Sequence, residues 1–420
     1  MDADHVRLGR IADKLAAARV KPLPPKAFGV EAHGFKLDPP LPEAAVAEFE
    51  ERHEVTLPAG YRLFITELGA GGAGPGYRMS RLGTSCCTYR RSGHLAKPSP
   101  YLPGPRYTGD WEQRYEDPPG PDRGFLLGTL EVADHGCSLS TKLIVTGPAR
   151  GRLFNLDSDG WIGPYVVEDA DFLSWYERWL DEAVAGYDVG FFGERLPLDE
   201  PELIAVLAED PSPERRAQAG ESLLMLPAIS DRTRDALVGA MTSDPDPTVR
   251  AQCWGLLGPG RPNRTRELEN PDAIADEIAH YARSRTPPDL GALSSLRKLS
   301  YTDVLPELGA RHDLERRRKA AYQLSEPWNF WQKELPQDLL GEVADGLLSD
   351  ADPILRKHGV GVVDWFDLTH FHPRLREMQE TETDPWVQHK LTWCLDQQRT
   401  RIRDDFTAPV QQGNHDEPPF

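Results

Sequence analysis

The feature that most constrains the fold of this 420-residue chain is an internal repeat in its second half. Each copy combines a polar turn with Asp and Pro, an Arg or Gln, a small or compact residue three positions later and an apolar residue seven positions later. The copies lie 34, 67, 39 and 32 residues apart, with a weaker copy at Pro288–Leu296, so the unit is near 34 residues long. The motif positions are Arg216, Ala219 and Leu223; Arg250, Cys253 and Leu257; Arg317, Ala320 and Leu324; Arg356, Gly359 and Val363; and Gln388, Leu391 and Leu395.

A unit of this length cannot bury its own apolar faces, so pairs of helices must stack into a solenoid. We expect Asp-Pro to open the second helix of each pair, because Pro fits the first helical position. The Arg is expected to bond carboxylates or carbonyls of the preceding turn, and the two later positions to face the neighbouring repeat. The units resemble HEAT repeats in a divergent bacterial form. This resemblance implies an all-α solenoid over residues 203–405, and the polar, Pro-rich tail at 406–420 is expected to be disordered.

The first half opens with two marked helices and a glycine-rich loop. Pro42 and Glu43 mark the start of the first helix, where the dipole favours an acidic residue. A second helix begins at Pro58 and ends at Gly69, and its apolar positions are Tyr61, Phe64, Ile65 and Leu68. The loop at 69–76 follows a helix, whereas a phosphate-binding loop follows a strand and opens a helix. We therefore expect a structural or partner-facing loop.

Strand-like patterns follow in the next part of the chain. Short runs rich in aliphatic and aromatic residues are separated by turn signals, at Phe125–Val132, Leu139–Val145, Gly151–Leu156 and Trp161–Val167. They predict an antiparallel sheet. Asp169 or Asp171 can cap a helix whose apolar stripe, including Trp179, ends at Gly186, and this helix is expected to pack on the sheet.

Two blocks in this half, FEERHEVTLPAGYRLFITELGAGGAGPGY and Val132–Val184, resemble the SUKH superfamily of yeast cell-wall synthesis regulators and bacterial immunity proteins. The resemblance implies an α+β domain over residues 1–190, with an antiparallel sheet and packed helices. A linker at 191–202 would join it to the helical repeats. It also implies binding without catalysis, since bacterial members typically neutralise toxin domains, many of them basic nucleases, by occluding the active site.

Composition narrows the range of partners. The formal net charge of −19 repels phosphate backbones and attracts cationic proteins, although it can also serve solubility alone. No apolar run approaches the ~20 residues of a membrane span, so no membrane association is expected. The N-terminus lacks the apolar core of a signal peptide, and five cysteines do not make a disulfide framework. The expected location is the cytoplasm.

One cluster has the residue types of a metal site. It consists of Cys86, Cys87 and His94 together with His135 and Cys137. Adjacent cysteines on an extended strand point to opposite faces, and no Cys-x-x-Cys pair is present. His135 and Cys137 could also be a base and a nucleophile, but no nearby carboxylate would orient them. We expect a buried thiol and a hydrogen-bonded imidazole, with no metal and no cofactor.

The stretch NLDSDGW resembles the start of a calcium loop. Asn155, Asp157 and Asp159 alternate before Gly160, but the twelfth position is Val166 where such a loop has Glu. Strands rather than helices flank it, so a hairpin turn is the better prediction.

Aromatic residues in the repeats, including Trp365 and Phe366, either anchor a partner or fill the core between repeats. The isolated Trp254, Trp386 and Trp393 fit the core better. The residues expected to contact a protein partner are Gly71, Gly72, Tyr77, Asp157, Asp159, Trp161, Trp328, Phe330 and Trp331.

These features favour an acidic immunity protein that binds and neutralises a cationic toxin domain. The main alternative is a regulatory scaffold that assembles endogenous proteins, with the repeats as a second docking surface. A third reading is an enzyme that acts through the HEAT-like repeats, which would need a basic groove or a catalytic carboxylate in a pocket.

Overall fold

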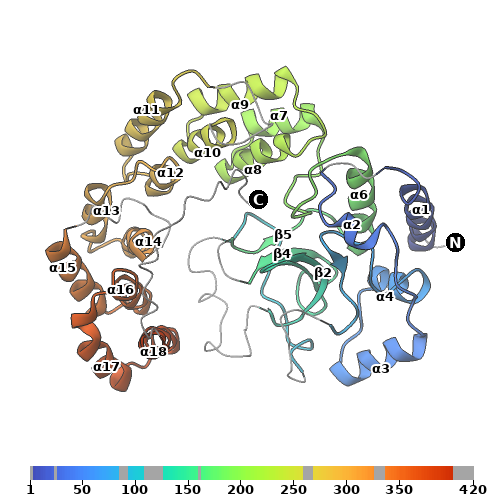
Figure 1. Cartoon of the computed structure of the whole chain (residues 1–420), viewed down its shortest axis with the longest axis horizontal. Helices are drawn as coiled ribbons and strands as arrows, with labels where there is room; N and C mark the ends of the chain where they lie inside the picture. Colours follow the sequence, from blue (N-terminus) through green and yellow to red (C-terminus); the bar gives the residue numbers. More distant parts are fainter. Residues whose placement is uncertain are drawn as a thin grey trace, which may run out of the picture. The chain divides into compact units, whose positions relative to one another are not determined.

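The computed structural model describes residues 3–22, 26–84, 93–107, 126–158, 162–258, 268–325 and 336–400. The chain has a mixed α+β architecture that is mostly helical, with a small antiparallel sheet (Figure 1). Contacts between residues divide it into two compact units, Met1–Leu335 and Pro336–Phe420. None of the described helices is both long and apolar enough to cross a membrane.

The helices expected in the first half are present. The two helices predicted at Pro42 and Pro58 begin one residue later, with each Pro at the N-cap. The predicted sheet-packing helix is capped by Asp171, whose carboxylate accepts from Ser174 N at 2.7 Å, and Gly186 ends it in the left-handed conformation. The described helices of this half, predicted or not, are α1 (Ala3–Ala18), α2 (Val30–His33), α3 (Glu43–His53), α4 (Ala59–Glu67) and α6 (Phe172–Ala185).

The sheet is antiparallel in the order β1-β2-β3-β4-β5. The four predicted strands are confirmed with shifted ends. The sequence did not predict β1, a two-residue edge strand that pairs with Asp134 and Ala133 of β2. The strands are β1 (Arg78–Met79), β2 (Thr129–Gly136), β3 (Leu139–Ile144), β4 (Leu153–Asp157) and β5 (Tyr165–Val166).

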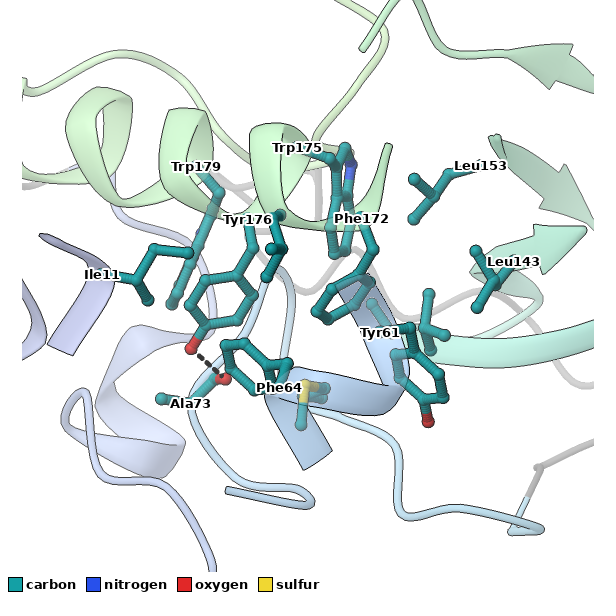
Figure 2. Close-up of a cluster of buried hydrophobic side chains, with 14 of the residues drawn as sticks. Ile11, Tyr61, Phe64, Ala73, Leu143, Leu153, Phe172, Trp175, Tyr176 and Trp179 are labelled. Carbon is teal, nitrogen blue, oxygen red and sulfur yellow. Dashed lines mark hydrogen bonds between the residues drawn. The ribbon is translucent and has the colours of Figure 1, made fainter. Parts of the chain in front are cut away.

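Large aromatic side chains fill the space between the sheet and α6. Figure 2 shows Leu143 and Leu153 of the sheet beside Phe172 and Trp175 of α6. The expected apolar stripe is confirmed, because Trp179 is fully buried. The other face of the sheet carries a second apolar cluster that includes Ile144, Phe154 and Val166.

The described part of the repeat region contains helices and no strands, as the sequence predicts. In the first unit α8 packs against α7 and α10, and α9 packs against α10 (Figure 1). The first-unit helices are α7 (Glu200–Glu209), α8 (Pro213–Leu224), α9 (Asp231–Ser243), α10 (Pro247–Leu257), α11 (Pro271–Ser284), α12 (Leu290–Ser295), α13 (Tyr301–Leu308) and α14 (Leu314–Ser325). The second-unit helices are α15 (Gln337–Leu348), α16 (Pro353–Trp365), the 3₁₀ turn η3 (Thr369–Phe371), α17 (His372–Thr381) and α18 (Pro385–Thr400).

The motif Arg or Gln bonds the backbone of its own turn, as expected. In four copies its side chain donates to the carbonyl oxygen six residues earlier. Arg216 reaches Asp210 O at 2.8 Å, and Gln388 reaches Glu382 O at 2.9 Å. Arg317 differs, because it donates to Leu308 O nine residues back. The arginine thereby satisfies a carbonyl that the end of the preceding helix leaves exposed.

A second bond links consecutive repeats within each unit. Arg216 makes a bidentate pair with Asp244, the acidic residue of the next turn, with both N–O distances at 2.8 Å. Arg356 pairs in the same way with Glu382, at 2.7 and 2.8 Å. Each turn carboxylate also accepts a backbone N–H two residues ahead. We call this recurring set of bonds the arginine ladder.

One expectation about the motif is wrong in the copy where the structure tests it. The position three after the arginine was predicted to face the neighbouring repeat. At Gly359 an added Cβ would lie 2.9 Å from Leu348 N, in the first helix of the same pair. The small residue therefore lets the two helices of one pair approach closely.

Residues 191–202 were expected to be a linker. They instead contact α6 on one side and α8 on the other. Phe192 and Leu196 are buried, and the guanidinium of Arg195 bonds the buried carboxylate of Glu182 in α6. On the other side, Leu196 N donates to Ser222 Oγ of α8 at 3.0 Å. The structure thus connects the sheet and the first repeats through buried polar contacts.

Candidate functional site

The glycine-rich loop extends the sheet at its β1 edge. Gly72 forms single β-bridges with Leu37 on one side and Met79 on the other. Its φ of +84° is left-handed, and an added Cβ would lie 2.5 Å from Lys36 O. Gly71 is buried with a φ of +145°, and an added Cβ would lie 2.8 Å from Asp38 Oδ2. Of the loop residues expected to contact a partner, Gly71 and Gly72 therefore have a structural reason to be glycine.

Tyr77 ends this loop and is exposed, with 41% of its surface accessible. Its ring lies against that of Phe28, with centroids 5.2 Å apart, and its N–H donates to Asp134 O at 2.8 Å. A Cβ on Gly136 would lie 2.4 Å from the tyrosine ring, so only glycine lets the ring rest on the β2–β3 hairpin. These contacts hold an exposed aromatic side chain in one place.

Asp157 lies at the same end of the sheet. Gly136 pairs with Leu139, and Leu139 pairs with Asp157, which brings this residue close to the hairpin under Tyr77. Asp157, which the sequence suggests as a partner contact, is buried, with only 2% of its surface accessible. Its carboxylate instead accepts from Ile162 N at 3.1 Å, which fits the predicted hairpin turn.

Five other predicted contact residues, Asp159, Trp161, Trp328, Phe330 and Trp331, lie outside the described residues. Among the residues that are described, the tryptophan expected in the repeat core at position 393 is exposed, as is Trp365. The sequence also missed Phe28 and Gly136, which position Tyr77. No local pattern marks either residue, since their role depends on a contact between distant segments.

A buried polar network lies behind this end of the sheet. Thr141 Oγ1 donates to Asn155 Oδ1 at 2.8 Å, so it accepts from His135 Nε2 at 2.8 Å. Asn155 then donates to Glu194, which Arg106 also bonds. The network joins three strands to the segment that leads into α7.

His135 in this network is suited to a structural role. Burial lowers the pKa of its imidazole to about 4, so the ring is neutral at pH 7. Its Nε2 is engaged by Thr141, whereas Cys137 is exposed at the tip of the hairpin. The expected hydrogen-bonded imidazole is confirmed at Nε2 only, because Nδ1 is buried without a hydrogen-bond partner, and the expected buried thiol at position 137 is wrong.

The described residues contain no group of three His, Cys, Asp or Glu side chains placed to hold a metal ion, and Cys86 and Cys87 lie outside them. Searches for similarity to known protein families, to curated proteins and to solved structures gave no match.

Proposed function

We propose that this protein acts by binding another protein without catalysis, and that it neutralises a cationic toxin domain. In this proposal the sheet and its helices are a SUKH-like binding domain and the helix pairs are HEAT-like repeats. The observation that carries the proposal is Tyr77, an exposed aromatic ring held by Phe28 and by the β2–β3 hairpin. Rigid aromatic side chains are frequent anchors of protein interfaces, because little entropy is lost when they bind.

The net charge supports the choice of partner. With a net charge of −19, the surface would attract a basic domain and accelerate the encounter. The partner would be recognised by its charge at long range and by Tyr77 at contact.

The test begins with capture of partners on the immobilised full chain, followed by purification of each captured protein. We expect one of them to have a catalytic activity that the wild-type chain inhibits. Tyr77→Ala should weaken this complex by at least about 30-fold, the effect of losing a 2 kcal/mol anchor. The matched control is Val20→Ala, which truncates another exposed apolar side chain. Equal affinities of the two variants, or partners whose activities are unaffected, would reject the proposal.

The regulatory scaffold is the second candidate, and a separate observation favours it. Trp365 and Trp393 are exposed in the second unit, which offers an apolar surface besides that around Tyr77. A scaffold would bind two proteins at once and leave their activities unchanged. Analytical ultracentrifugation of the ternary mixture, with activity assays, separates the two functions.

A further inference from the structure

The arginine ladder is interrupted at the turn between α11 and α12. In two other repeats the residue that caps the C-terminus of the first helix is acidic, Asp244 after α9 and Glu382 after α17. Each accepts a bidentate bond from the motif arginine of the preceding repeat. After α11 the C-cap is Arg285. Arg250, the motif arginine of the preceding repeat, therefore has a residue of its own charge at the position where the ladder places a carboxylate.

Both arginines lie beside one aromatic ring. Helix α10 packs against α11 and α12 (Figure 1), and Tyr281 of α11 donates its hydroxyl to Pro245 O, in the turn before α10, at 2.9 Å. The guanidinium carbon of Arg250 lies 4.1 Å from the centroid of the tyrosine ring, and that of Arg285 lies 5.8 Å from it. Two like charges at one ring repel each other, and a bound anion removes this repulsion.

Each guanidinium keeps N–H groups that can bind such an anion. Arg216 uses all three of its side-chain nitrogens in the ladder, whereas Arg250 donates to the described residues only through Nε, to Asp244 O. The side chain of Arg285 is exposed and bonds no acceptor in the described part of the chain. No described carboxylate lies within 4.0 Å of either guanidinium. The Nη groups of Arg250 and the whole head of Arg285 are therefore available to a ligand.

The carboxylates of the surrounding turns are already bonded. The carboxylate of Asp244 pairs with Arg216. Asp246 caps α10 by accepting from two backbone N–H groups. Asp289 caps α12 and also accepts from Thr248 Oγ1 at 2.9 Å. An acceptor for the two arginines therefore has to come from outside these turns.

We infer that Arg250, Tyr281 and Arg285 form a binding site for the carboxylate of an aspartate or glutamate in a protein partner. Guanidinium groups bind carboxylates through paired N–H bonds, and a carboxylate is the acceptor that the ladder uses at this position in the turns of Asp244 and Glu382. The site goes beyond the proposed function, because it selects an acidic residue whereas the net charge of the protein attracts basic domains.

The inference is tested on the full chain with a fluorescent peptide of alternating glutamate and glycine, at physiological salt. The same peptide with glutamine in place of glutamate has nearly the same size and no charge. The net charge of −19 repels the glutamate peptide, so tighter binding of this peptide requires a local cationic site. We expect the glutamate peptide to bind at least ten-fold more tightly. Equal affinities, or tighter binding of the glutamine peptide, would overturn the inference.

Two variants and a matched control assign the binding to this turn. Arg250→Gln and Arg285→Gln should each weaken binding of the glutamate peptide at least ten-fold. Arg311→Gln removes another exposed arginine of the first unit, between α13 and α14, and should change the affinity less than two-fold. Equal losses in Arg285→Gln and Arg311→Gln would count against the site, since any exposed arginine would then serve.

A charge reversal tests the comparison between the turns. Arg285→Glu supplies a carboxylate at the C-cap, as in the turns of Asp244 and Glu382. We expect this variant to lose peptide binding and to melt about 2 °C above Arg285→Gln, because the new carboxylate pairs with Arg250. An equal or lower melting temperature would show that Arg250 does not accept a carboxylate at this position, and the inference would be wrong.

Three further results would also reject the inference. If Arg285→Gln lowers the melting temperature of the free protein by more than about 3 °C, a carboxylate of this chain already occupies the site. If inorganic phosphate displaces the peptide and succinate at equal ionic strength does not, the site selects phosphate. If Tyr77→Ala abolishes peptide binding, the peptide binds around Tyr77. Unchanged peptide binding in that variant keeps this test separate from the test of the proposed function.

Discussion

The sheet region and the repeat region are stabilised in different ways. The sheet packs on a few very large side chains of one helix, where Trp175, Tyr176 and Trp179 are fully buried. The repeats bury small residues at the equivalent position of each pair, Ala219, Cys253, Ala320 and Gly359, and connect their turns through the arginine ladder. Stability in the first region is therefore concentrated in single residues, and in the second it is divided among many similar contacts.

The largest effect is expected at the junction between these regions. A fragment of residues 1–190 lacks Phe192, which packs against Trp175, and Arg195, which bonds Glu182. We expect it to be less stable than a fragment of residues 1–198 by about 5 kcal/mol or more, the combined cost of a lost buried aromatic and a broken buried pair. Urea unfolding of both fragments measures this difference. Equal stabilities would show that 191–202 is the independent linker that the sequence suggests.

Trp179→Ala should destabilise the sheet region by about 3–5 kcal/mol, the usual cost of deleting a buried large aromatic. Its indole packs against the rings of Tyr176 and Phe35 in the core. Trp393→Ala is the matched change on an exposed tryptophan and should cost less than about 1 kcal/mol. Chemical denaturation of both variants checks the contrast. Similar losses in the two would mean that the repeats, too, depend on single large residues.

The stability of the sheet region should depend on the protonation of His135. The pKa of this residue is about 4 in the folded state and about 6.5 in an unfolded chain. Below pH 6.5 the unfolded chain gains a proton that the folded protein does not bind, so stability falls as the pH drops from about 6.5 to about 4. The loss attributable to this residue is roughly 3 kcal/mol, and none is expected above pH 7.

Thermal unfolding of His135→Gln against pH tests this dependence. The variant should lose less stability than the wild type between pH 6.5 and 4. His5→Gln, at an exposed position, should behave like the wild type. Parallel pH profiles of the wild type and His135→Gln would contradict the assigned role.

The smallest of these effects is expected from a single break in the arginine ladder. Arg216→Ala leaves Asp244 buried without its cation, yet this carboxylate keeps its bond from Asp246 N. We expect a loss of about 2 kcal/mol. Arg234→Ala, which removes an exposed pair with Asp231, should cost less than about 0.5 kcal/mol. A loss above about 5 kcal/mol in the Arg216→Ala variant would contradict this, because a single pair of the arginine ladder would then contribute as much to the free energy of unfolding as a core aromatic residue.

Much of the fold follows from local pattern. The sequence predicts α6 well, because its N-cap residue, its helix-forming residues and the spacing of its apolar residues all indicate a helix. The same holds for the helices that begin at Asp-Pro turns. Strand β1 could not be predicted, because two residues are too few to show the alternation of apolar and polar residues that marks a strand. The strand forms only because it pairs with β2 and Gly72. The segment 191–202 looks like a linker because it carries two Pro and four acidic residues, yet Phe192 and Leu196 are buried by distant segments.

The candidate site was predicted less completely. Tyr77 could be proposed as a partner contact from the sequence, but its support by Phe28 and Gly136 depends on contacts between distant segments. Asp157 looked exposed because Asp is common in turns, whereas this one bonds a backbone N–H inside the turn. Trp393 looked buried because tryptophan usually is, but its place in the repeat faces outward.

The arginine ladder bears on how such a chain can change its length. In two places a turn presents a carboxylate to the arginine of the repeat before it, in the pairs Arg216–Asp244 and Arg356–Glu382, and a chain in which every turn carried this pair would have interchangeable boundaries. When a whole repeat is duplicated or lost, the arginine and the carboxylate on either side of the new boundary are still complementary. Recombination between such copies can therefore lengthen or shorten the helical region by one repeat at a time, and the new boundary needs no new pair of interacting residues.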